Sequence, residues 1–151
     1  MSFRILQIAV PFIWFGALGA ISFMEAPLKF TAPNITLELG LGIGRIVFQT
    51  LNKIELALAV LLIVSMLARR PAKKFPLYAF GAVLLLLILE TFWLLPVLDA
   101  RAEQVIAGTA APYSNAHIIY IVFDAAKFLL LAALGISLTK ENLKAAPQPT
   151  G

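Results

Sequence analysis

Four long runs of apolar residues, separated by short polar connections, dominate the pattern along this chain. They cover residues 5–24, 43–67, 75–96 and 116–138. Each run has about 20 residues, which at a rise of about 1.5 Å per residue can cross a hydrocarbon core about 30 Å thick. Because backbone N–H and C=O groups in lipid have to be satisfied within their own segment, each run is predicted to be a helix. The pattern therefore predicts an all-α fold, an integral membrane four-helix bundle over residues 1–140 with a short polar tail over residues 141–151.

Composition supports this class, since 61% of the residues are hydrophobic and only 13% are charged, whereas about 25% of the residues of soluble domains are charged. The chain has no cysteine, which excludes disulfides, thiolate catalysis, zinc–thiolate sites and iron–sulfur clusters within it. The first run is longer than the apolar core of a signal peptide and three more runs follow it, so it is interpreted as a membrane span. The net charge is +4, but the basic residues gather in the connections, which indicates membrane orientation and not a nucleic-acid partner.

The distribution of these basic residues predicts which side of the membrane each connection faces. Four spans place both termini and the connection between the second and third spans on one side. Seven basic residues lie on that side: Arg4, Arg69, Arg70, Lys73, Lys74, Lys140 and Lys144. The opposite side holds Lys29 and Arg101, with Arg45 at its margin, against Glu38, Asp99 and Glu103. The positive-inside rule then places both termini in the cytoplasm and predicts a multi-pass protein of the bacterial inner (plasma) membrane, surrounded by the lipid bilayer.

The outer connection between the first two spans, residues 26–44, is more apolar than a solvated linker. It combines several prolines and glycines with six leucines or isoleucines and Phe30. Such a segment is expected to lie against the bundle or in the membrane interface. We therefore predict that it is ordered and that Phe30 and several of its leucines are buried.

Polar side chains are concentrated in the half of each span that this orientation places in the outer leaflet. In the fourth span they are spaced by 3, 4 and 3 positions, which puts them on one face of a helix. In the second span, one helix face carries Arg45, Gln49, Asn52 and Lys53, and Glu55 flanks this face. The predicted polar cluster consists of Glu25, Arg45, Gln49, Asn52, Lys53, Glu55, Glu90, His117, Tyr120, Asp124 and Lys127.

The charged members of this cluster are expected to pair with one another. An unpaired charge near the bilayer centre costs at least about 2.5–3.5 kcal/mol, and the cluster has four acids, three bases and His117 as a further titratable group. The cluster then either fixes helix register through ion pairs or forms a polar pocket, open to the outer side, that binds a ligand, ion or partner. Depth along the helices predicts the pairs Lys127 with Glu55, Lys53 with Asp124 or Glu90, and Arg45 with Glu25.

Two stretches, residues 23–55 and 95–127, resemble a group of bacterial four-span proteins and, more distantly, the superfamily that includes the human transmembrane protein 205. Its members have an Ala-Pro-x-x-Phe-like element after the first span, a polar motif after the third, and a His-x-x-Ser/Tyr element at the start of the fourth. The matching positions are Pro27, Phe30, Arg101, His117 and Tyr120. The resemblance implies the four-span fold and supplies no chemistry.

A second resemblance is to the membrane-associated eicosanoid and glutathione metabolism proteins, which are also four-span chains of this size. They carry an Arg…Asn-x-x-Glu pattern at the start of the second span that is used in glutathione binding. Arg45, Asn52 and Glu55 match it here. The upstream Glu, a second Arg and the Pro after the Glu are missing, which weakens the match.

The leading hypothesis is an integral inner-membrane protein whose charge-paired pocket in the outer half of the bundle gives it a ligand-binding, accessory or transport-associated role. A small molecule or a lipid is expected as the ligand, and a second copy of the chain or another membrane subunit as a protein partner. The alternative is a membrane enzyme for a lipophilic substrate, either glutathione-dependent or an acid/base isomerase that uses Glu90, Asp124 or His117. No catalytic residue, metal or cofactor is assigned. Haem ligated on both sides would need Met24 beside His117, the single histidine of the chain, and is therefore not favoured.

Overall fold

The computed structural model describes residues 2–109 and 113–144, and these residues form helices and connections without a strand. The elements are α1 (Ser2–Leu18), the π-helical turn η1 (Gly19–Glu25), α2 (Ala26–Leu28), the 3-10 turn η2 (Lys29–Thr31), α3 (Leu37–Ala68), α4 (Phe75–Leu89), the π-helical turn η3 (Glu90–Leu94), α5 (Leu95–Ile106) and α6 (Ala116–Lys144). Within the described residues they join into four helices that are long and apolar enough to cross a membrane: Phe3–Thr31, Leu37–Ala68, Phe75–Ile106 and Ala116–Leu143. The predicted all-α class and the four helices of membrane-spanning length are confirmed.

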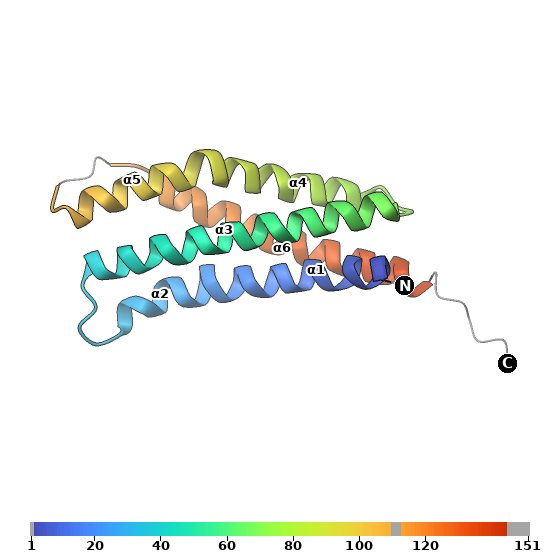
Figure 1. The fold of residues 1–151 in the computed structure, drawn as a ribbon, viewed down its shortest axis with the longest axis horizontal. Helices are drawn as coiled ribbons and strands as arrows, with labels where there is room; N and C mark the ends of the chain where they lie inside the picture. The colour runs from blue at the N-terminus through green and yellow to red at the C-terminus, as the bar shows by residue number, and fades with distance from the viewer. Residues whose placement is uncertain (1, 110–112, 145–151) are drawn as a thin grey trace.

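The four long helices lie side by side in an elongated bundle (Figure 1). α1 packs against α3 and α6, α4 packs against α6, and α5 packs against α3. The start of α1, the connection between α3 and α4, and the end of α6 lie at one end of the bundle, here called the terminal end (Figure 1). The other two connections lie at the opposite end, called the far end. Of the predicted polar tail, residues 141–144 continue α6, and residues 145–151 lie outside the described residues.

Apolar side chains fill the core of the bundle. Trp14 of α1, Leu62 of α3 and Leu134 of α6 are fully buried there. The seam between α1 and α6 needs small residues, because a Cβ atom added to Gly135 would come within 2.9 Å of the ring of Phe12. Glycine at such a position lets two membrane helices approach closely.

A π-helical turn precedes a proline in both the first and the third long helix. In the third helix the N–H of Leu95 donates to the carbonyl of Glu90, five residues back, and Pro96 follows. Proline has no N–H to donate and its ring crowds the preceding turn, and the wider turn accommodates it. The predicted end of the third span at Pro96 is therefore wrong, because α5 carries the helix on to Ile106. The turn η1 stands before Pro27 in the same way.

The structure describes the whole connection before α3, and the prediction that its apolar side chains are buried is wrong. Residues 26–44 form α2, η2, an irregular turn over residues 32–36 and the first turns of α3. Phe30 is 43% exposed, although its ring covers Gly40 of α3. Leu37 and Leu39 are more than half exposed, at 57% and 55%. The reason is that this short segment packs on one side only, so its outer face has no protein cover from the described residues.

A polar network outside the predicted polar cluster joins three helices at the terminal end. The amide of Gln7 donates to the carbonyls of Ser65 at 3.0 Å and Arg69 at 2.6 Å. Asn142 of α6 donates to Gln7 Oε1 at 3.2 Å. Gln7, Ser65 and Asn142 are buried, so this network links α1, α3 and α6 without any net charge.

Candidate functional site

Lys127 of α6 stands at the centre of a buried group of ionisable side chains. Its Nζ atom is 2.8 Å from Glu55 Oε1, contacts Glu90 Oε2 and is 3.1 Å from Asp124 Oδ1. Trp14 Nε1 donates a hydrogen bond of 2.8 Å to the same oxygen of Glu55. The lysine is 0% exposed and each of the three acids is 1% exposed. Side chains from α1, α3, η3 and α6 thus meet at one point, and we call the four ionisable residues the Lys127 cluster.

The Lys127 cluster confirms one predicted pair and corrects another. The predicted pair of Lys127 with Glu55 is present. The prediction that Lys53 pairs with Asp124 or Glu90 is wrong, because both acids contact Lys127 and the side chain of Lys53 is exposed. Within the described residues Lys53 forms no ion pair. Depth along a helix did not specify the direction in which each side chain leaves it, and Lys127 points toward the bundle axis.

The cluster contains three carboxyl groups for a single ammonium group. Among the described residues no hydrogen-bond donor reaches Glu55 Oε2, Glu90 Oε1 or either oxygen of Asp124. The Asp124 oxygen 3.1 Å from Lys127 Nζ is close enough for charge attraction, but it lacks the alignment of a hydrogen bond. Buried polar atoms in proteins usually have a hydrogen-bond partner. Four unpartnered oxygens in one place therefore distinguish this cluster from a simple structural ion pair.

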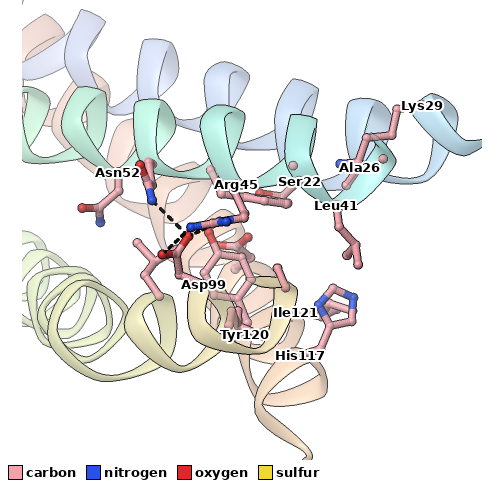
Figure 2. A pocket seen from close by; sticks show the side chains of 18 of the residues that line it. Ser22, Ala26, Lys29, Leu41, Arg45, Asn52, Asp99, His117, Tyr120 and Ile121 are labelled. Atoms are coloured by element: carbon pink, nitrogen blue, oxygen red, sulfur yellow. Dashed lines mark hydrogen bonds and ion pairs between the residues drawn. The ribbon is translucent and has the colours of Figure 1, made fainter. Parts of the chain in front are cut away.

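A second ionic contact lies nearer the far end and ties α3 to α5. Arg45 Nε donates to Asp99 Oδ1 at 2.5 Å, and Arg45 Nη2 donates to Asp99 Oδ2 at 3.0 Å and to Glu103 Oε1 at 2.7 Å. The two bonds to Asp99 form a bidentate pair, and Figure 2 shows Arg45 reaching across to this carboxylate. The predicted pair of Arg45 with Glu25 is wrong, since Glu25 pairs with Lys29 at 3.3 Å.

By the sequence pattern alone, Asp99 and Glu103 lie in a connection, outside the predicted polar cluster. The structure places them on α5, one helical turn apart and facing Arg45. Their spacing of four residues would have indicated a shared helix face. That signal was missed because the helix was expected to stop at Pro96.

A pocket of about 870 Å³ lies between the far-end elements. Figure 2 shows it from close by, with lining side chains that project from several helices. Most of the lining is apolar and includes Phe23, Phe30, Leu41, Phe48 and Leu95. Most of the polar lining residues come from α3, α5 and α6, and the π-helical and 3-10 turns add Ser22, Lys29 and Thr91.

Seven of the residues predicted for the polar cluster line this pocket: Arg45, Gln49, Asn52, Lys53, His117, Tyr120 and Asp124. Gln49 donates to Asp99 at 3.2 Å, and Asn52 donates to Thr91 at 2.8 Å. Asp124 belongs both to the pocket lining and to the Lys127 cluster, so it connects the two. The structure thus brings most of the predicted residues into one half of the bundle, and ligand binding by them stays a prediction.

The structure also bears on metal binding and on the resemblance to the glutathione-binding pattern. Within the described residues no group of three His, Asp or Glu side chains is placed to hold a metal ion. Arg45 and Glu55, which the glutathione-binding pattern would use together, are held in separate salt bridges. Comparison of the chain with protein-family models, with curated proteins and with solved structures finds no match. The family resemblances therefore stay predictions.

Proposed function

We propose that this chain is a multi-pass protein of the bacterial inner membrane, with both termini in the cytoplasm, that binds a lipid or a lipid-soluble small molecule in the far-end pocket. The observation that carries this proposal is the pocket of about 870 Å³ with mainly apolar walls and a few polar groups. Ligand-binding pockets typically have volumes of about 300–1,000 Å³, and a small number of polar groups in an apolar lining orient the ligand.

The charges around the pocket indicate how such a ligand would be oriented. The charge of Arg45 is already balanced by Asp99 and Glu103. Lys53 lines the pocket, is exposed and has no ion-pair partner among the described residues. A ligand with an apolar body against Phe48 and an anionic or hydrogen-bond-accepting group near Lys53 would fit this arrangement. A protein of this kind would take its ligand from the outer leaflet and either move it or present it to a partner subunit.

Blocking the pocket provides the test. Ala26 lines the pocket, and Ala26→Phe places a ring where the ligand would lie. Ala57→Phe on the exposed face of α3 introduces the same ring away from the pocket and is the matched control. Each protein is purified in a mild detergent, and the molecules that remain bound are identified and quantified by native mass spectrometry.

We expect the unaltered protein and the Ala57→Phe variant to retain the same species at similar occupancy. The Ala26→Phe variant should retain about tenfold less, which corresponds to about 1.4 kcal/mol of lost binding free energy. Equal occupancy in all three proteins, or no retained species in the unaltered protein, would count against a ligand-binding pocket.

A further inference from the structure

The Lys127 cluster has more acidic groups than it has positive charge to balance them. If Glu55, Glu90 and Asp124 were all ionised, they and Lys127 would carry a formal charge of −2. All four side chains are at most 1% exposed, and they lie within helices of membrane-spanning length. Excess charge in such surroundings is costly, and a buried acid responds by taking up a proton.

Groups outside the cluster do not remove this excess. Arg45 is engaged by Asp99 and Glu103, and Trp14, which donates to Glu55, is uncharged. The titratable or charged groups that interact with Asp124 are Glu55 from α3, Glu90 from η3, and Tyr120 and Lys127 from α6. The other titratable or charged residues that line the same pocket are Lys29, Arg45, Lys53, Asp99 and His117.

We propose that the Lys127 cluster is a proton-binding site that holds one proton among its three carboxyl groups and exchanges it through the pocket, which Asp124 lines. Glu55 accepts hydrogen bonds from Lys127 and Trp14, and Glu90 accepts one from Lys127. Asp124 accepts none from the described residues on either oxygen. Among the described residues of the cluster, Asp124 is also the acid that lines the pocket.

The geometry favours a proton over a metal cation. The ammonium group of Lys127 already occupies the position toward which the three acids point, and it would repel a second cation. Uptake of one proton forms an O–H bond on one of the three carboxyl groups and changes the formal charge of the cluster from −2 to −1. The new O–H is a donor, and the carboxylate oxygens of the cluster that have no donor among the described residues can accept from it.

This site links protonation to the state of the pocket. A ligand that changes the charge or the water access next to Asp124 changes the proton affinity there, and by thermodynamic linkage the proton changes the ligand affinity. Buried acids of this kind in membrane helices form the proton relays of transporters. The proton site itself does not depend on which ligand, if any, enters the pocket.

Infrared spectroscopy of the carboxyl groups tests the proposal. We expect the purified protein at neutral pH to show the C=O band of one protonated carboxylic acid per chain, shifted by transfer to heavy water. Asp124→Asn removes one negative charge from the cluster, so its remaining acids need no proton and the band should disappear. The chain has two aspartates, Asp99 and Asp124, and Asp99→Asn, the matched control outside the cluster, should keep the band.

Four outcomes would overturn the proposal. The first is the absence of a protonated carboxyl band in the unaltered protein at neutral pH. The second is loss of the band in Asp99→Asn but not in Asp124→Asn. The third is failure of Asp124→Asn to fold, because asparagine has nearly the same shape as aspartic acid and leaves the cluster with the same formal charge as one bound proton does. The fourth is disappearance of the band when sodium is added at constant pH, which would make the site a sodium site.

Discussion

At the scale of single residues, Lys127 depends most strongly on its partners. A lysine is almost never fully buried unless it is paired, and this one is 0% exposed. Its long side chain carries the ammonium group to three acids from α3, η3 and α6. The ion pairs and the hydrogen bond from Trp14 to Glu55 therefore connect all four long helices at the same position along the bundle.

Replacing Lys127 should destabilise the protein much more than replacing a similar lysine nearby. Lys127→Met keeps the apolar stem but leaves the acids without their counter-charge, and breaking a buried pair in this way costs roughly 3–5 kcal/mol. We expect a large drop in folded yield and in the midpoint of thermal unfolding in detergent. Lys53→Met makes the same chemical change at an exposed position and should have little effect. If both variants unfold at the temperature of the unaltered protein, the cluster has no structural role.

At the scale of elements, the connection before α3 is positioned by one aromatic contact, from Phe30, and by one cation, Lys29. The ring of Phe30 lies on Gly40, at the start of α3. The ammonium group of Lys29 is 5.5 Å from the ring centre of Phe30 and 5.3 Å from that of Phe48, which is within the range of cation–π attraction. These contacts hold η2 against α3 beside the pocket.

Adding a methyl group at Gly40 should release this connection. The Cβ atom of Gly40→Ala would clash with the ring of Phe30, whereas a Cβ atom on Gly42 meets nothing within 4 Å. We expect faster tryptic cleavage after Lys29 in Gly40→Ala than in the unaltered protein. Gly42→Ala gains the same helix propensity, about 1 kcal/mol, and should be cleaved no faster. Identical cleavage rates in both variants would mean that Phe30 does not hold the connection in place.

At the scale of the whole molecule, the two ends of the bundle differ in chemistry. The terminal end is joined by an uncharged network around Gln7 and Asn142. The far half holds the pocket, the Arg45 contact and, next to the pocket, the Lys127 cluster. In a protein that crosses a membrane, this asymmetry places the pocket nearer to one leaflet than to the other, so the orientation decides from which side the pocket could be reached.

The distribution of basic residues predicts that the terminal end faces the cytoplasm, and labelling of single cysteines can check this. The chain has no cysteine of its own, so Lys73→Cys and Thr109→Cys each introduce one reactive thiol, at the terminal end and the far end. In intact cells we expect Thr109→Cys to react with membrane-impermeant thiol reagents and Lys73→Cys to react only with permeant ones. The reverse result would place the pocket in the cytoplasmic leaflet.

The sequence alone determined the fold class and the approximate helix positions, because crossing a membrane requires about 20 apolar residues in one run, which is a local property. It also determined which polar residues share a helix face, since the spacing of His117, Tyr120, Asp124 and Lys127 follows the helical repeat. The pair of Lys127 with Glu55 followed from their similar depth along two helices.

Only the tertiary structure decided which partners the other charges meet. Asp124 and Glu90 contact Lys127 and not Lys53, since pairing depends on the rotation of each helix about its axis, which is set by packing of the whole bundle. Arg45 meets Asp99 because the π-helical turn η3 lets the third helix continue past Pro96. Both outcomes arise from contacts between distant segments, and neither the spacing of residues nor their depth along one helix contains that information.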